Sequence, residues 1–599
     1  MNPLATLRGW VRVVASLARI AFTAAPARAS AAVGVVCLGA VLSLTSSYQI
    51  KAVVQAAAGG SPARALTAAL ILAGAAGAAW IANQAYTQLQ PRVSEAITVH
   101  LDAELIRLTA RIPTLEFADR PIFADKISLI RSGAQQLAGG LQAVTISLRT
   151  GVMLTGTFVI LVGIDPWLAL LPLFAIPRAL AGRRARQLTV RAQEATAEPM
   201  RLRGHLFSHA TSPVAGKELR VFGLGDELSQ RYRDLTASTR QLNIRANWVG
   251  AVWSSLGDLA FTVGCVAAIA WLVVRAASGQ VSPAGVVLAA TMATGLVLQM
   301  NGALQFAQYL QAMTVTVERY LWLTDFSNEA VSATRADAAP PPALRRGIEV
   351  EGIGFAYPDR DRPALSDIWL ELPAGRVVAL VGENGSGKST LVKLLCGFYR
   401  PSAGRILVDD LELSRIDPAT WRSRIRGAFQ DFANLEVTLL ESVSIGELAQ
   451  LGDRERTGEA LVRAGAETLA DLSPEGLDAM LGKPWGGMAL SGGQWQKLAL
   501  SRALMRERPL MVVFDEPTAA LDPSAEHELF ERLVADVRSG DAGGRSTLIV
   551  SHRFSTVRMA DAIAVLDAGR IVEFGSHQRL MAAGGRYAEL FELQARAYR

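Results

Sequence analysis

The chain has 599 residues, which is more than one hydrophobic core normally holds and predicts two or three domains. Half of the residues are apolar and only 19% are charged, which argues against an entirely water-soluble protein. The net charge of +6 fits either nucleic-acid binding or the cytoplasmic loops of a membrane protein. The three cysteines lie far apart and indicate neither a disulfide framework nor a zinc site.

Apolar residues are concentrated before about residue 315, where six segments have the length and composition of membrane-spanning helices. The segments cover residues 31–50, 65–83, 144–163, 167–180, 250–274 and 284–304. Pro172 and Pro177 fall inside the fourth, so its limits are the least defined. The basic residues before the first segment predict a retained cytoplasmic helix and not a cleaved signal peptide.

The charged residues between these spans indicate the topology. Residues 183–245 hold twelve Lys or Arg and six Asp or Glu, and residues 91–136 are also rich in charge, whereas the alternate loops are nearly bare. Basic loops face the cytoplasm, so six spans place both termini there. Topology therefore explains the net charge, and we expect no nucleic-acid partner.

The two long loops show helical periodicity, so the membrane helices should continue into the cytoplasm. Each loop contains a break, "IPTLEFADRPIFADKI" at residues 112–127 and "TSPVAGKELRVFGL" at residues 211–224. A simple turn between two helices would explain either break.

A Pro- and Ala-rich linker, placed at residues 331–346, leads to a second domain. Its short β-branched runs alternate with helical patterns, which predicts a parallel α/β sheet covered on both faces. One run leads into "GENGSGKST", which matches the phosphate-binding loop G-x-x-x-x-G-K-[ST]. The loop residues predicted to bind nucleotide are Gly382, Glu383, Asn384, Gly385, Ser386, Gly387, Lys388, Ser389 and Thr390.

Two acids follow another buried run, "LMVVFDEP". At the carboxyl edge of the sheet they would lie beside the phosphate-binding loop. We expect Lys388 to reach the β- and γ-phosphates, and Ser389 and Asp515 to hold Mg²⁺. Glu516 would orient and polarise the attacking water.

With the phosphate-binding loop, "LSGGQ" at residues 490–494 and "FDEPTAALD", the chain resembles the ATP-binding cassette (ABC) transporters. The resemblance covers the whole chain and implies an exporter-type half-transporter. The expected fold is an α-helical six-span transmembrane domain at residues 1–330, followed by an α/β P-loop cassette domain at residues 347–599.

The resemblance also implies a second half-transporter as partner, in a homodimer or a heterodimer. Two cassettes would face head to tail, so that the phosphate-binding loop of one and the "LSGGQ" signature of the other enclose the same ATP. The signature residues in this chain are Ser491, Gly492, Gly493 and Gln494.

Further residues match single positions of the family pattern. Tyr357 matches the aromatic residue that stacks on adenine, and Gln430 matches the glutamine that touches Mg²⁺. Asp522 matches the aspartate that faces the other cassette, and His552 the catalytic histidine at the γ-phosphate. The two cytoplasmic breaks match coupling helices. Unlike the common exporter pattern, "GKPWGGMA" replaces an acidic stretch before the signature.

The expected function is ATP-hydrolysing export of a peptide, natural product, drug or lipid, with membrane lipid around the spans. The alternatives are a lipid flippase, an importer with an exporter-like fold and, less favoured by the intact Glu516 and signature, a nucleotide-gated channel. Six spans argue against a soluble ABC ATPase. The expected location is a bacterial inner or plasma membrane, with the cassette in the cytoplasm.

Four polar residues in the last two spans are candidates for the transport path. Asp258 lies inside an apolar run, where a lipid-facing charge costs roughly 2.5–3.5 kcal/mol, so it should face a wet cavity or a partner. Asn301, Gln305 and Gln308 share one helix face. The alternatives are an interhelical hydrogen bond for Asp258 and a helix end in the cytoplasm for the other three.

Overall fold

The computed structural model describes most of the chain and divides it into two compact units. The described residues are 3–117, 123, 126, 127, 130, 137, 139–212, 215–334, 337–358, 362–516, 531, 532, 534, 535 and 544–597. Met1–Glu104 and Leu129–Tyr320 form the helical unit, and Leu105–Ser128 and Leu321–Arg599 form the α/β unit. Each unit has hydrophobic clusters of its own.

The helical unit consists of long helices. Its elements are α1 (Pro3–Ala24), α2 (Pro26–Ala58), most of α3 (Pro62–Ala110), α5 (Gly140–Ile164), η1 (Pro166–Phe174), α6 (Ala175–Ala210), α7 (Gly216–Val221), α8 (Gly225–Ala277) and most of α9 (Pro283–Ser332). In the described part of the chain, α2, α3, α5 and α8 are long and apolar enough to cross a membrane, and α9 begins with a shorter apolar stretch, Pro283–Leu296. This set is compatible with the six predicted spans.

The fourth predicted span, residues 167–180, differs from a regular helix. It is a 3₁₀-helix through Phe174 and becomes α-helical only from Ala175. Pro172 lies inside the 3₁₀ segment and lacks a backbone N–H donor, which disfavours α-helical hydrogen bonding there. Pro177 lies in the first turn of α6, where its missing N–H donor has no intrahelical partner to lose.

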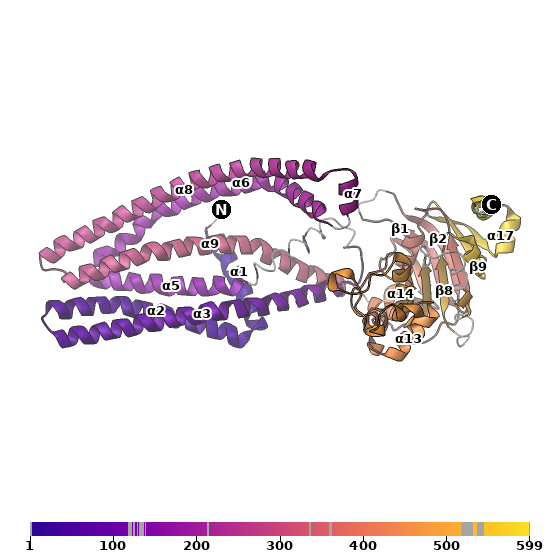
Figure 1. Cartoon of the computed structure of the whole chain (residues 1–599), viewed down its shortest axis with the longest axis horizontal. Coiled ribbons are helices and arrows are strands. Elements are labelled where there is room, and N and C mark those ends of the chain that lie inside the picture. Colours follow the sequence, from indigo (N-terminus) through magenta and orange to yellow (C-terminus); the bar gives the residue numbers. More distant parts are fainter. Residues whose placement is uncertain are drawn as a thin grey trace. The chain divides into compact units, whose positions relative to one another are not determined.

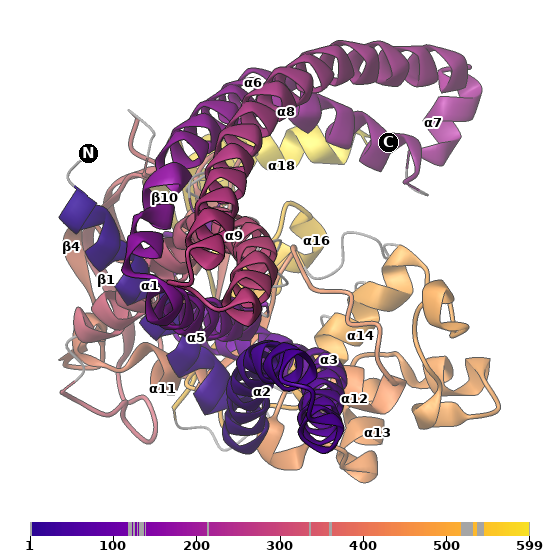
Figure 2. The same cartoon turned by 90° about the vertical axis from the view of Figure 1, so that its left-hand side faces the viewer.

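Helices α6 and α8 run side by side (Figures 1 and 2). Gly257 of α8 permits this contact, since a Cβ there would lie 2.9 Å from both the Ala181 Cβ and the Arg178 Cα of α6. Next to it, the Nε of Arg178 lies 2.8 Å from Oδ1 of Asp258. The pair is thus joined by close backbone packing and by an ion pair.

The α/β unit contains two sheets. Its strands are β1 (Gly347–Phe355), β2 (Leu365–Pro373), β3 (Val377–Val381), β4 (Ala403–Val408), β5 (Leu411–Glu412), β6 (Ile425–Ala428), β7 (Met511–Asp515), β8 (Ser546–Val550), β9 (Ala562–Asp567) and β10 (Arg570–Gly575). The predicted parallel sheet is present, with order β10-β9-β3-β8-β7-β6 and only β10 antiparallel to its neighbour. A second, antiparallel sheet of order β2-β1-β4-β5 was not predicted from the sequence.

Helices cover the six-stranded sheet and connect its strands. They are α10 (Lys388–Leu395), η2 (Leu413–Arg415), α11 (Pro418–Arg422), α12 (Leu439–Ser444), η3 (Leu448–Gln450), α13 (Arg454–Arg463), η4 (Glu467–Leu472), η5 (Gly476–Asp478), η6 (Lys483–Trp485), α14 (Gly492–Leu504), α16 (Phe554–Val557), α17 (His577–Ala583) and α18 (Arg586–Ala597). Leu391 and Leu394 of α10 join one buried cluster with the two sheets, whereas Leu461 of α13 and Leu498 of α14 join another with β7.

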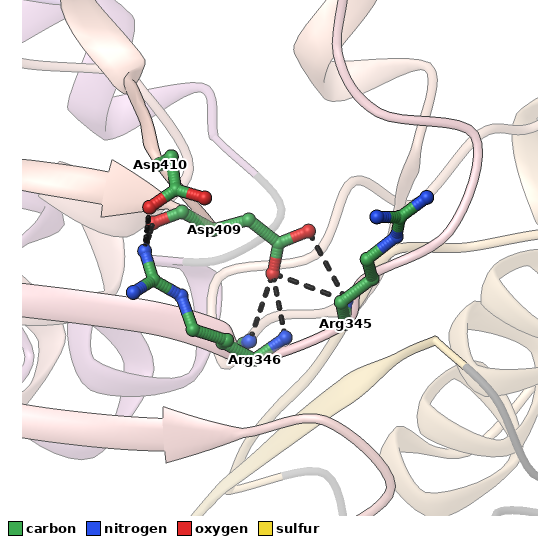
Figure 3. A network of polar contacts seen from close by, with 5 residues as sticks. Arg345, Arg346, Asp409 and Asp410 are labelled. Atoms are coloured by element: carbon green, nitrogen blue, oxygen red, sulfur yellow. Dashed lines mark hydrogen bonds and ion pairs between the residues drawn. The ribbon is translucent and has the colours of Figure 1, made fainter.

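The predicted linker is attached to the α/β unit. Asp337 forms a two-pronged ion pair with Arg415, with both N–O distances 3.0 Å, and Pro342 accepts a hydrogen bond from Arg424. Where the linker meets β1, the Asp409 carboxylate accepts hydrogen bonds from the backbone amides of Arg345, Arg346 and Gly347 (Figure 3).

The first cytoplasmic break belongs to the α/β unit. The Leu115 amide donates to the Phe398 carbonyl at 2.8 Å, and Arg422 donates to the Pro113 carbonyl at 2.7 Å. Much of this break lies outside the described residues. The second break contains the short helix α7, at the position where the family resemblance implies a coupling helix.

Candidate nucleotide-binding site

The phosphate-binding loop joins β3 to α10, as predicted. Gly387 has φ +109°, and a Cβ there would lie 2.7 Å from a side-chain carbon of Leu365. At Gly382, a Cβ would lie 2.1 Å from the Leu566 carbonyl oxygen. Only glycine fits these close approaches, which shape a loop whose N–H groups can face phosphate oxygens.

Lys388 lies over this loop and is almost completely buried. Its Nζ donates to the carbonyl oxygens of Gly382 and Glu383, each at 2.9 Å. Burial lowers the pKa of Lys388, and the nearby carboxylates of Glu516 and Asp515 act in the opposite direction. The ammonium is thus positioned for an anion at the loop.

Asp515 ends β7 and is 5% exposed. Burial, and secondly the charge of Glu516, raise its pKa to about 6, although hydrogen bonding from Ser389 and the charge of Lys388 oppose this. Among the described residues its Oδ1 has no hydrogen-bond partner. A buried carboxylate oxygen of this kind, next to a serine hydroxyl, suits a hard divalent cation.

Glu516 is the point at which the predicted catalytic residues meet. Its Oε2 accepts a hydrogen bond from Nε2 of Gln430 at 3.2 Å, and its Oε1 lies 3.2 Å from Nδ1 of His552. Gln430, Glu516 and His552 follow β6, β7 and β8, which are neighbours in the sheet. Because the carboxyl ends of parallel strands share one edge, three distant segments converge there.

Tyr357 follows β1, and its side chain reaches the first turn of α10. Its hydroxyl is 3.1 Å from Oγ1 of Thr390, and its ring packs edge-on against those of Phe355 and Tyr399 at centroid distances of 5.0 and 5.5 Å. The predicted adenine-binding residue is therefore held beside the phosphate-binding loop.

The signature residues begin α14. Ser491 is the N-cap, and its Oγ accepts from the Gln494 amide while Oε1 of Gln494 accepts from the Ser491 amide. This reciprocal capping box leaves the exposed Ser491 and Gly492 at the helix N-terminus, where anions bind favourably. Within the described residues, no hydrogen bond joins Ser491 to the phosphate-binding loop. Asp522 lies outside the described residues.

Two contacts at the site were not predicted from the sequence. Gln496 donates from Nε2 to the backbone carbonyl of Glu516 at 3.2 Å, and Arg586 of α18 contacts the loop residue Glu383 at 2.5 Å. Gln496 lies two positions after the end of the signature, and this closeness in sequence was the signal that it could lie near the site. Arg586 lies 203 positions from its partner, so the sequence held no local signal for it.

The unusual "GKPWGGMA" stretch before the signature forms a tight loop. The indole Nε1 of Trp485 donates to Oε2 of Glu436 at 3.0 Å, and a Cβ at Gly482 would lie 2.6 Å from the Glu436 carboxyl carbon. Glu436 belongs to the segment that follows Gln430. The replacement residues thus connect the loop before the signature to that segment.

In the helical unit, a cavity of about 720 Å³ lies between α2, α5 and α9. Its wall is partly polar, with Arg149, Gln142 and Gln299, and partly apolar, with Leu44, Met153 and Phe306. Asp258 is not among the lining residues; it lies on α8, where it is paired with Arg178 of α6. The side chains of Asn301, Gln305 and Gln308 lie outside the described part of the structure.

A phosphate-binding loop and the predicted catalytic residues lie at the edge of one parallel sheet, on a chain with membrane-spanning helices, which is the arrangement of a membrane transporter driven by nucleotide hydrolysis. The chain matches the family described as ABC transporter over residues 365–519, and the family described as ABC transporter transmembrane region over residues 31–300. This protein belongs to the ABC transporter family. It binds ATP and couples ATP hydrolysis to transport, as predicted.

Curated relatives and a solved structure agree with this assignment. An ATP-dependent lipid A-core flippase of Chromobacterium violaceum is 29% identical over 523 residues, covering 86% of this chain and 84% of that protein. The protein of the same name from Bordetella avium is 33% identical over 414 residues, covering 69% and 68%. The structure of a bacterial Atm1-family ABC exporter with ATP bound matches with TM-score 0.80 and 24% identity, covering 95% of this chain and 98% of that one, and shows the exporter fold.

Proposed function

We propose that this chain exports an anionic amphiphile of the lipid class, as one half of a dimer. The cavity between α2, α5 and α9 carries the proposal. Its wall combines apolar side chains with one guanidinium, that of Arg149. An apolar pocket with few polar groups binds the body of a ligand and fixes its orientation, and a guanidinium suits a phosphate group.

Arg149 is well placed for this role. Its side chain is exposed to the cavity, and it also lines a smaller cavity of about 100 Å³ beside α3. The Asn83 side chain of α3 accepts a hydrogen bond from its Nη1 at 3.4 Å, which engages one of the five N–H donors of the guanidinium. The flippase relatives are named for lipid A-core, which favours a lipid over a peptide as the substrate class.

For the ATP site, we propose that the residues described above have the roles in Mg²⁺ binding, hydrolysis and adenine binding that were predicted from the sequence. The orphaned Oδ1 of Asp515 and the hydroxyl of Ser389 fit Mg²⁺, with Gln430 as a further oxygen ligand. Bound there, Mg²⁺ would neutralise phosphate charge. Glu516 would hold the attacking water, His552 would contact the γ-phosphate, and Tyr357 would stack on adenine.

The exporter fold works as a dimer. We propose that Ser491, Gly492, Gly493 and Gln494 of one chain complete the ATP site of the other, and that Asp522 faces the partner. The partner is a second half-transporter, in a homodimer or a heterodimer. The proposed location is a bacterial inner membrane, with both termini and the α/β unit in the cytoplasm. The basic loops between the spans support this orientation.

The experiment measures ATPase stimulation of the purified protein in phosphatidylcholine nanodiscs. Phosphatidylglycerol, a set of apolar peptides and cationic drugs are added in separate titrations. We expect the phosphate-bearing anionic lipid to stimulate. Arg149→Gln should raise its half-maximal concentration about tenfold, because a charge-assisted hydrogen bond contributes about 1.5–3 kcal/mol.

Arg64→Gln is the matched control, since Arg64 is an exposed arginine in the first turn of α3 that does not line the cavity. It should leave the titration unchanged. Stimulation by peptides or drugs alone, or an unaltered lipid titration with Arg149→Gln, would overturn the lipid assignment. Transport of fluorescent phosphatidylglycerol toward the cytoplasmic side would overturn export.

A further inference from the structure

Glu516 has a backbone conformation that needs support. Its φ is +48°, in the left-handed region that residues other than glycine occupy at a cost of about 1–3 kcal/mol. Its amide donates to the Val550 carbonyl of β8 at 3.0 Å, and its carbonyl accepts from Nε2 of Gln496 at 3.2 Å. The peptide groups on either side of the catalytic carboxylate are thus held by two different elements.

Gln496 reaches Glu516 from α14, the helix that begins at the signature. Its side chain is 7% exposed, so the contact forms away from solvent. Further along the same helix, Arg502 donates to the carbonyls of Ser442 at 2.8 Å and Ala433 at 3.2 Å. Ser491 and Gln496 therefore stand on one rigid helix, five positions apart.

We propose that Gln496 is a positioning residue that sets the backbone of Glu516 according to the position of the signature helix. This inference rests on the proposed sharing of each ATP between two chains. When the N-terminus of α14 engages the ATP held by the partner, Gln496 on that helix fixes the catalytic glutamate of its own chain. Each signature helix then connects the two ATP sites of the dimer.

The geometry explains why a displacement at Ser491 would reach the chemistry. Ser491 and Gln496 belong to the same continuous, capped helix with a buried face, so a displacement at its N-terminus would be transmitted to Gln496. A shift of about 1 Å in a catalytic group can reduce the rate by up to about a hundredfold. Gln496 thus couples occupancy of one site to the alignment of Glu516 in the other.

The test uses Gln496→Met, which keeps the length of the side chain and removes the donor. We expect kcat for ATP to fall about tenfold with KM within twofold of wild type, because alignment is lost while nucleotide binding is retained. The Hill coefficient for ATP should fall toward 1. Ser501→Ala is the matched control. It removes another buried hydrogen bond of α14, from Ser501 Oγ to the Lys497 carbonyl, that is remote from Glu516.

A double-mutant cycle with Glu516→Gln separates positioning from general destabilisation. If Gln496 acts through Glu516, the double variant should be no slower than Glu516→Gln alone. The proposal would be overturned if the reductions in kcat caused by Gln496→Met and by Glu516→Gln multiply in the double variant. It would also be overturned if Gln496→Met leaves kcat unchanged. If Gln496→Met does not fold, Gln496→Asn keeps the amide but is one methylene too short, and the same outcomes decide. A wild-type protein without cooperativity in ATP would instead contradict the shared site.

Discussion

Asp258 of α8 and Arg178 of α6 form an ion pair with 2.8 Å between Oδ1 and Nε. Arg178 is only 3% exposed, and Asp258 is 48% exposed in the isolated chain. The pair lies next to Gly257, where a Cβ would lie only 2.9 Å from the Arg178 Cα of α6. This favours the interhelical alternative for Asp258, whereas the cavity that suits a substrate lies between α2, α5 and α9.

Removing Asp258 should therefore destabilise the protein. Asp258→Ala leaves the buried Arg178 without this partner, and because Asp258 is about half exposed, the loss should lie between the ~1 kcal/mol of a surface pair and the ~3 kcal/mol of a fully buried one. The thermal unfolding midpoint in detergent should fall, and Arg178→Met combined with Asp258→Ala should restore most of the loss. A double variant less stable than Asp258→Ala would contradict the pairing. If Asp258→Ala instead alters the stimulation of ATPase activity by substrate and leaves stability normal, Asp258 belongs to the transport path.

Glu516→Gln should slow ATP hydrolysis by two or more orders of magnitude while ATP still binds. The substitution keeps shape and the contact with Gln430, and weakens the hold on the proton of the attacking water. Turnover and nucleotide affinity are measured on the same protein in lipid. His552→Gln is measured in parallel, because His552 is the second side chain in contact with the Glu516 carboxylate. Wild-type turnover in Glu516→Gln would remove the assignment.

The sequence predicted which residues lie at the site better than it predicted the contacts that hold them in place. Glu516 and His552 each follow a buried β-branched run, so the rules of parallel sheets bring them together, whereas Gln430 was identified only from its match to the family pattern. The position of Gln496 two residues after the signature was a signal for its closeness to the site, but helix packing decides its contact with Glu516, and the path of the C-terminal helices decides the contact of Arg586. The antiparallel sheet was missed since β1 and β2 mix burial on both faces, without the continuous apolar run of β3. Asp258 showed that a partner was needed, but not that Arg178 supplied it.

The shared ATP site predicts a specific result for mixed dimers. Lys388→Ala and Ser491→Arg placed in one chain, with a wild-type partner, damage each site once. The same two changes placed in different chains damage one site twice and leave the other intact. Only this second dimer should occlude ATP stably, as measured by retention of labelled nucleotide after rapid gel filtration. Equal retention in both dimers would show that Ser491 does not serve the partner's site.

The Asp409 carboxylate predicts how stability depends on pH. Burial alone would raise its pKa, but hydrogen bonds from the amides of Gly347, Arg346 and Arg345 outweigh this and lower the pKa below its ordinary value of 3.8 (Figure 3). A lowered folded-state pKa stabilises the protein above the unfolded-state pKa, and this contribution disappears as the pH falls through the folded-state value. Asp409→Asn should therefore lower the unfolding midpoint at pH 7 by about 2–4 °C per kcal/mol lost, and by less at pH 2, which lies well below the unfolded-state pKa. Midpoints of the full chain are followed by tryptophan fluorescence.

The control is Asp410→Asn, because the exposed Asp410 carboxylate contacts the Arg346 guanidinium as a surface ion pair and should contribute much less. A difference between wild type and Asp409→Asn that is the same at both pH values would show that the three amides do not stabilise the charged carboxylate.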